Sequence, residues 1–222
     1  WRDDDAVAPT PALDALLHLS NETALPVHLA IIPAHATSAL AETVREAPLI
    51  PLVHGWAHHD HSGADEKKNE FLTDRPDLAR DSARGLARMQ ALFGDRLCPV
   101  FVPPWNRVHP ALLPTLAAQG FTAISTFGPR ARTEAAPGLI EINTHVDPIW
   151  WKGTRDLVTP EVLLRDAASH LQARRQGDED ATEPFGLLTH HLVHTPAIWA
   201  FSHAFIHEML SGGEHPRTPE TT

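Results

Sequence analysis

The stretch His54-Gly55-Trp56-Ala57-His58-His59-Asp60-His61 carries four imidazole side chains within eight residues. It follows the apolar run 50–53 and precedes a polar segment, a pattern that predicts a buried strand ending in a loop. Neutral imidazole is the commonest protein ligand for zinc-like ions, and the spacing of His54 and His58 lets both reach one cation. The stretch is therefore a candidate metal site, and the alternative is a solvated loop rich in histidine.

The composition limits the classes of partner. The chain has 222 residues and a formal net charge of −10, and its longest run of basic residues is Arg174-Arg175. This charge pattern argues against nucleic acid or an anionic membrane as the main partner. No apolar run approaches the roughly 18 residues of a membrane span. The single cysteine, Cys98, excludes an intrachain disulfide framework and a cysteine-based zinc site.

The first residues leave the compartment open. The chain starts with Trp1 directly before an acidic cluster, which predicts that residues upstream have been removed. A missing signal peptide therefore carries little weight, and we only favour the cytoplasm over other compartments.

Strand and helix patterns alternate along the whole chain. Such alternation predicts parallel strands joined by crossover helices, in a closed barrel or in an open sheet. No glycine-rich phosphate loop follows the first strand, which favours the barrel. We predict one domain over residues 1–210 and a disordered tail over 211–222. The predicted strands are 1–5, 27–32, 50–53, 99–102, 121–125, 139–147 and 185–189, and the predicted helices are 10–20, 37–46, 76–93, 110–119, 159–177 and 197–210.

Polar residues cluster at the carboxyl ends of these strands. In a barrel of parallel strands these ends converge on one face, where catalytic residues gather. Convergence favours the metal site over the solvated loop, with an aspartate completing the ligands and another carboxylate available as a base. The clusters are Asp3–Asp5, His54–His61, Pro103–Arg107, His145 with Asp147, and His190 with His191.

In their order along the chain, these motifs resemble those of the polysaccharide deacetylase (NodB-homology, carbohydrate esterase) family. The acidic run Asp3-Asp4-Asp5 is similar to the family's aspartate pair, and His54-x-x-x-His58 to its ligand motif. Pro104-Trp105 resembles the groove motif, and Leu187-Leu188-Thr189-His190 resembles the Leu-x-x-His motif. The resemblance spans residues 1 to about 194, nearly the whole chain.

The resemblance implies an α/β fold, a distorted (β/α)7 barrel, and a metal-dependent carbohydrate deacetylase. It implies one divalent ion, most simply zinc, held by Asp5, His54 and His58. Asp4 would be the catalytic base and His190 the acid. For the carbohydrate substrate, it implies that Trp105 lines the groove and Leu187 walls the acyl pocket.

Several positions depart from the family pattern. The family has a small residue after the metal aspartate, so we prefer Asp4 and Asp5 over Asp3 and Asp4 as base and ligand. The arginine that usually pairs with the base is replaced by Phe101 and Val102, and either Arg2 or Arg107 could substitute.

Two assignments near the end of the chain stay open. The aspartate that orients the catalytic histidine is loosely matched by Asn143, His145 and Asp147, which share one strand face by the two-residue period. Of these we assign a role to Asp147. Either His190 or His191 could be the acid, because alternate residues of a strand face opposite sides.

Two other functions fit the same sequence. The missing arginine favours a carbohydrate-binding protein that keeps the barrel and the metal without catalysis. A metal-dependent phosphoesterase is the other alternative, but no cluster of Arg or Lys lies near the candidate site in the sequence.

Overall fold

The structure, a computed structural model, describes residues 1–213. Its centre is one curved sheet with the strand order β6-β7-β5-β4-β3-β2-β1-β8. Neighbouring strands are parallel, except that β6 and β7 are antiparallel. The strands are β1 (Arg2–Ala6), β2 (Val27–Ile31), β3 (Leu49–His54), β4 (Val100–Val102), β5 (Ala123–Ile124), β6 (Glu134–Ala136), β7 (Leu139–Glu141) and β8 (Leu188–Thr189).

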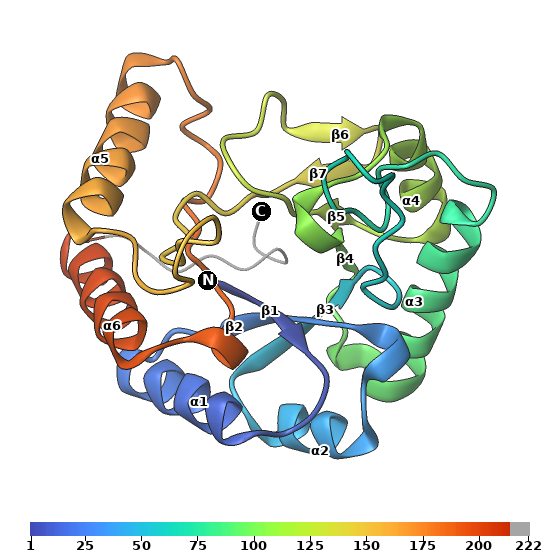
Figure 1. Cartoon of the computed structure of the whole chain (residues 1–222), viewed down its shortest axis with the longest axis horizontal. Helices are drawn as coiled ribbons and strands as arrows, with labels where there is room; N and C mark the ends of the chain where they lie inside the picture. Colours follow the sequence, from blue (N-terminus) through green and yellow to red (C-terminus); the bar gives the residue numbers. More distant parts are fainter. Residues whose placement is uncertain (214–222) are drawn as a thin grey trace.

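Helices form a ring around the sheet, and the N-terminus lies inside this ring (Figure 1). The α-helices are α1 (Pro11–Thr23), α2 (Ser38–Glu46), α3 (Leu78–Phe93), α4 (Leu113–Gln119), α5 (Pro160–Gln176) and α6 (Pro196–Ser211). Short 3₁₀ helices are η1 (Pro33–His35), η2 (Gly94–Arg96), η3 (Pro104–Asn106), η4 (Pro110–Leu112) and η5 (His191–Val193). None of the helices within residues 1–213 is long and apolar enough to cross a bilayer.

Local signals explain where these helices begin and end. The Thr10 hydroxyl accepts a hydrogen bond from the Leu13 amide, and Pro11 occupies the first turn of α1. Thr37 caps α2 in the same way. Gly177, with a φ of 83°, ends α5 in the left-handed conformation that glycine adopts without strain.

The barrel is distorted because its two end strands barely meet. One isolated parallel bridge, Val146 to Leu187, joins the segments that continue β7 and precede β8. The seven predicted parallel strands and the distorted barrel are confirmed. The antiparallel edge strand β6 was missed, since no strand was predicted between residues 125 and 139. The predicted disordered tail lies outside the described residues from residue 214 onward, and α6 extends to Ser211.

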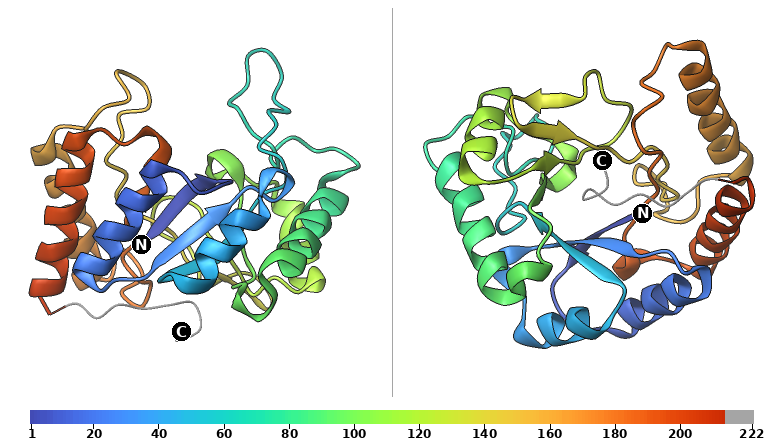
Figure 2. Two further views of the ribbon diagram at one scale, coloured as in Figure 1. Left: turned by 90° about the horizontal axis from the view of Figure 1, so that it is seen from below. Right: turned by 180° about the vertical axis from the view of Figure 1, so that it is seen from behind.

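The main apolar core lies between the sheet and helices α1 to α4. Every residue of β2 is buried, which is typical of a parallel strand covered on both faces. A second cluster joins the segment before β8 to α5 and α6 through Leu187, Leu163 and Phe205. The long loop after β3, drawn in teal, projects beyond the body of the molecule (Figure 2, left).

The buried imidazole of His28 is expected to make folding sensitive to acid. Burial lowers the pKa of His28 from 6.5 to about 3. Between these values the unfolded chain binds a proton that the folded chain does not, so stability falls as the pH falls. The slope is up to about 1.4 kcal/mol per pH unit.

Urea unfolding at pH 7 and pH 5, in the presence of a chelator, measures this effect. His28→Gln is expected to reduce the loss of stability between the two pH values. His18→Gln is the control, because the His18 side chain is 75% exposed. An identical pH dependence in wild type and His28→Gln would contradict the prediction.

Candidate metal and catalytic site

Three side chains converge at the carboxyl ends of β1 and β3. The Asp5 carboxylate Oδ1 lies 3.0 Å from His54 Nε2 and 3.3 Å from His58 Nε2. The three ligand atoms lie within 4.8 Å of one another, close enough to surround one cation. The predicted ligands Asp5, His54 and His58 are therefore brought together, and they could hold a divalent metal ion.

The chemistry of these donors fits a metal ion. His54 Nδ1 donates to the Val102 carbonyl at 3.0 Å, so Nε2, which lies 3.0 Å from Asp5 Oδ1, is the nitrogen that is left to bind a metal ion. A carbonyl that fixes the tautomer in this way is a usual partner of a ligating histidine. Burial raises the pKa of Asp5, but the hydrogen bond from His54 and the neighbouring imidazoles outweigh it and lower the pKa well below its usual range.

The two imidazoles are tuned in opposite directions. Burial opposes the charged form of His54, yet its hydrogen bond to Asp5 and the charges of Asp4 and Asp5 leave its pKa raised. Burial and the charge of His54 lower the pKa of His58. His58 is therefore the more readily neutral of the two, the form in which an imidazole binds a metal.

Unusual backbone conformations concentrate here. Within residues 1–213, six residues other than glycine have a positive φ. Asp5, His58, Trp105 and Asn106 are four of them, with φ between 55° and 75°. Asp5 also lies in an irregularity of β1, where the register against β2 shifts between Asp3 and Ala6. Such strain is typical of functional sites and re-aims side chains that regular strands would point elsewhere.

A buried carboxylate holds the loop between the two histidines. Glu70 is 1% exposed, and it accepts hydrogen bonds from the amides of Trp56 at 3.1 Å and Ala57 at 2.7 Å. Gly55 has a φ of 55°, and a Cβ added there would lie 2.4 Å from Glu70 Oε2 and 2.5 Å from Pro104 Cδ. Both residues therefore define the path from His54 to His58.

Gly55→Ala is expected to weaken metal binding and to destabilise the fold. The added Cβ meets Glu70 and Pro104, and the backbone conformation is strained for alanine. Titration with zinc and thermal unfolding measure the two effects. Gly128→Ala is the control, because it also has a positive φ but has open space around its Cβ. Equal losses in the two variants would show that backbone strain alone accounts for the effect.

Asp4 lies beside the candidate ligands and is held by Arg2. The guanidinium binds the carboxylate at two points, Nε to Oδ1 at 2.9 Å and Nη2 to Oδ2 at 3.0 Å. Both side chains are at most 4% exposed. Arg2 also donates to Asn106 Oδ1 at 2.7 Å and to Ser125 Oγ at 2.8 Å. Of the two candidate arginines, Arg2 is thus the one that contacts Asp4, whereas Arg107 donates to the Lys68 carbonyl.

His190 follows β8 and lies against Trp151 and close to Asp147. The Trp151 and His190 rings meet edge to face with centroids 4.7 Å apart. Trp151 Nε1 donates to Asp147 Oδ2 at 2.7 Å, and burial raises the pKa of Asp147 despite the opposing charge of His190. Within residues 1–213, the buried His190 Nδ1 has no hydrogen-bond partner.

The remaining candidates lie in different environments. Trp105 is half-buried, and its ring lies 4.1 Å from that of His58. His59 and His61 are exposed. His191 is buried and pairs with Asp3. Neither His191 nor Asp3 belongs to the cluster of Asp5, His54 and His58.

Asn143 and His145 do not share a site with Asp147. The amide of Asn143 and the His145 ring both bind Glu183, at 2.9 and 3.2 Å. Residues 142–147 leave the regular strand after β7, so the two-residue alternation expected for them does not apply.

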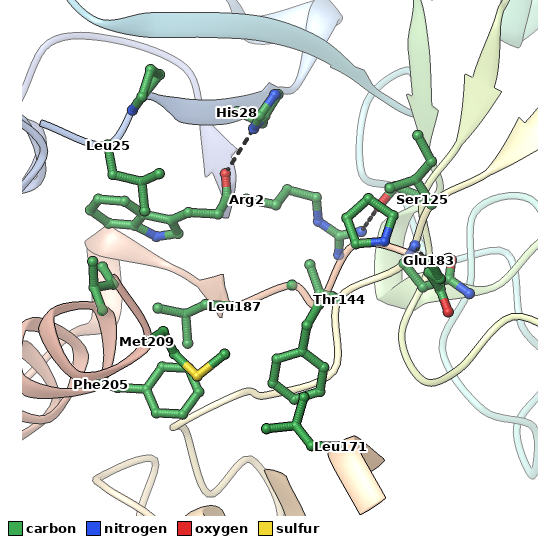
Figure 3. A pocket seen from close by; sticks show the side chains of 18 of the residues that line it. Arg2, Leu25, His28, Ser125, Thr144, Leu171, Glu183, Leu187, Phe205 and Met209 are labelled. Atoms are coloured by element: carbon green, nitrogen blue, oxygen red, sulfur yellow. Dashed lines mark hydrogen bonds between the residues drawn. The ribbon is translucent and has the colours of Figure 1, made fainter. Parts of the chain in front are cut away.

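A cavity of about 460 Å³ lies beside β1, and none of Asp5, His54 and His58 lines it. Arg2 runs along it to Ser125, and Phe205, Met209 and Leu187 line its apolar part (Figure 3). The Leu187 side chain thus lies in this cavity's lining and in the apolar cluster of α5 and α6.

Two contacts that shape the site could not be predicted from the sequence. Glu70 lies at the end of a polar loop that resembles a solvated segment, and its buried position depends on Trp56 and Ala57. Asn106 belongs to the predicted cluster 103–107, but its contact with Arg2 joins residues 104 positions apart. Neither contact follows from local spacing.

Comparison with known proteins adds a likeness in fold. No protein-family model and no curated protein sequence matches the chain. A solved structure from Mycobacterium smegmatis, described as a candidate polysaccharide deacetylase, has a TM-score of 0.65 and 18% identity over 93% of this chain and 79% of the other. A family 4 carbohydrate esterase from Streptomyces lividans, solved with acetate, has a TM-score of 0.59 and 14% identity over 96% and 86%.

A third similar structure is described as a family 4 pseudoenzyme from Bacillus anthracis. It has a TM-score of 0.60 and 14% identity over 97% of this chain and 61% of the other. At these identities the likeness concerns the fold, and the resemblance inferred from the motifs is confirmed at that level. The chain has the distorted barrel fold of the polysaccharide deacetylases and family 4 carbohydrate esterases.

Proposed function

We propose that this protein is a metal-dependent hydrolase that removes acetyl groups from an N- or O-acetylated carbohydrate. The observation that carries the proposal is the convergence of Asp5, His54 and His58 beside Asp4, a carboxylate held at two points by Arg2. A ligand set of two imidazoles and one carboxylate suits zinc and leaves coordination positions for water and substrate.

The chain's own residues would divide the chemistry between them. A divalent ion held by Asp5, His54 and His58 would polarise the acyl carbonyl and acidify a bound water. Asp4 would accept the proton of the attacking water, since Arg2 keeps its carboxylate fixed beside the ligands. The Trp105 amide would donate to the oxyanion of the tetrahedral intermediate.

His190 would complete the reaction as the acid. It would protonate the departing amine or alcohol oxygen, and Asp147 lies close enough to stabilise its charged form. The half-buried Trp105 ring over His58 and the exposed Trp151 offer apolar faces to a sugar ring. Leu187 would form part of the wall of the acyl pocket from its buried position.

Acetate release from acetylated chitooligosaccharides and acetylated xylan tests the proposal. The protein is stripped with a chelator, dialysed and reloaded with zinc, and acetate is measured by an enzyme-coupled assay. We expect activity that is lost on stripping and restored by zinc. Metal bound at one equivalent with no release from either substrate would contradict the deacetylase proposal.

A carbohydrate-binding protein without catalysis is the second candidate. The fold likeness to a pseudoenzyme favours it, as does the replacement of the family's arginine by Phe101 and Val102. The Arg2 contact with Asp4 weakens that reason, because the base retains a cationic partner. This candidate predicts saturable binding of the same glycans with zinc bound and no acetate released.

A further inference from the structure

Asp3 and His191 form a buried unit next to the proposed catalytic residues. Both side chains are fully buried, and the His191 Nδ1 hydrogen-bonds to Asp3 Oδ1. Asp3 Oδ2 accepts two further hydrogen bonds, from the Thr189 hydroxyl at 2.6 Å and from the His191 amide at 3.0 Å. One carboxylate on β1 therefore receives three donors from the segment that ends β8 and begins η5.

These donors flank His190 on both sides. Thr189 immediately precedes His190 and His191 immediately follows it, so Asp3 contacts both chain neighbours of the proposed acid. His190 is also the cap residue of η5, and the His191 amide is one of the donors that a helix start leaves unsatisfied. The Asp3 carboxylate thus determines where the backbone turns at His190.

The pair contributes geometry more than stability. Burying a carboxylate is costly, and an apolar pair of the same volume often stabilises a fold as well or better. Within residues 1–213, His191 Nε2 is buried without a hydrogen-bond partner, which adds to the cost. An apolar pair would not orient its neighbours. The three hydrogen bonds to the Asp3 carboxylate fix the positions of both the carboxylate and its donors.

We propose that Asp3 is a positioning residue for His190. This inference rests on the proposed function, in which His190 protonates the leaving group. The consecutive residues Asp3, Asp4 and Asp5 then have separate tasks. Asp4 accepts the proton, Asp5 binds the metal, and Asp3 fixes the backbone on both sides of the acid through contacts with residues 186 and 188 positions away in the chain.

His190 also contacts residues other than the Asp3 unit, and a displacement of its backbone would disturb these contacts. Its ring meets Trp151, and its amide donates to His194 Nε2 at 3.2 Å. A shift of the backbone moves the ring relative to these partners and to the leaving group. A misplacement of about 1 Å can cost on the order of 10²-fold in rate.

Leaving-group dependence tests the proposal. An acetylated sugar has a poor alkoxide or amine leaving group that needs an acid, whereas 4-nitrophenyl acetate releases a stable phenolate without one. Thr189→Val and Asp3→Ala are compared with Ser82→Ala, which removes another buried hydroxyl, one with two hydrogen bonds away from the site. Zinc content and thermal unfolding are measured for each variant.

For Thr189→Val we expect kcat on the acetylated sugar to fall by about 10-fold, and for Asp3→Ala by on the order of 10²-fold. KM and zinc content remain unchanged, and 4-nitrophenyl acetate turnover falls by much less. Ser82→Ala leaves the ratio of the two activities unchanged. If Asp3→Ala does not fold, Thr189→Val decides the question.

Two results would overturn the proposal. Equal losses on both substrates would assign Asp3 to the fold alone, and unchanged kcat on the sugar would remove it from catalysis altogether. If the wild type is inactive on both substrates, the proposed function fails instead. In that case a crystal structure of metal-free Thr189→Val tests the positioning role of Asp3. A His190 ring that stays against Trp151 overturns this role, and a displaced ring supports it.

Discussion

Replacing His54 with alanine is expected to abolish both metal binding and turnover. His54 is 2% exposed at the end of β3, and its Nε2 lies 3.0 Å from the Asp5 carboxylate. No other side chain in the loop replaces it, since His59 and His61 are exposed and lie outside the ligand cluster. Losing one of three protein ligands leaves Asp5 and His58, which do not suffice to hold a catalytic ion tightly.

Elemental analysis after dialysis and calorimetric titration with zinc measure the loss, and acetate release measures turnover. His61→Ala is the matched control, because it removes an imidazole of the same stretch that lies on the surface. We expect His61→Ala to retain one equivalent of zinc and full turnover. A His54→Ala variant that still binds one equivalent, or a wild type that binds none, would refute the metal site.

Replacing Asp4 with asparagine is expected to leave the metal bound and to remove catalysis. The amide keeps the shape of the carboxylate but cannot accept the proton of the attacking water. Loss of a general base typically costs 10² to 10⁴-fold, so we expect kcat to fall by roughly that factor. Arg2 then lacks its anionic partner, and some loss of stability accompanies the change.

Asp5→Asn makes this test decisive for the assignment of the aspartates. With Asp4 as base and Asp5 as ligand, Asp4→Asn retains zinc and Asp5→Asn loses it. With Asp3 as base and Asp4 as ligand, Asp4→Asn would lose zinc instead. Thermal unfolding of both variants shows whether either effect comes from the fold, and zinc titration compares their affinities directly.

Local patterns in the sequence were enough to predict most secondary-structure elements. The apolar runs at 27–32 and 50–53 are buried strands, and Thr10-Pro11 begins a helix because its hydroxyl and its ring suit the first turn. The strand β6 was missed because it has three residues, one of them exposed, and pairs only at the edge of the sheet. Such a strand depends on its partner β7 more than on its own residues.

The candidate site was predictable where it depended on spacing. His54 and His58 are four residues apart on one tight loop, and the ends of parallel strands meet at one face. The sequence left Arg2 and Arg107 as alternative partners of the base. The contacts of Arg2 with Asp4 and Ser125 form only when the interior of the barrel is assembled. The support of the loop by Glu70 had no signal at all.

The sequence by itself determined the alternation of strands and helices and the residue types at the strand ends, because these depend on local periodicity and on strand direction. The distorted barrel was implied by the resemblance of the motifs to a known family. Only the tertiary structure decided which of Asp3, Asp4 and Asp5 lies beside the histidines. An irregularity in β1 and a positive φ at Asp5 re-aim consecutive side chains. Partners distant in the chain, His191 for Asp3 and His54 for Asp5, then give each carboxylate its environment.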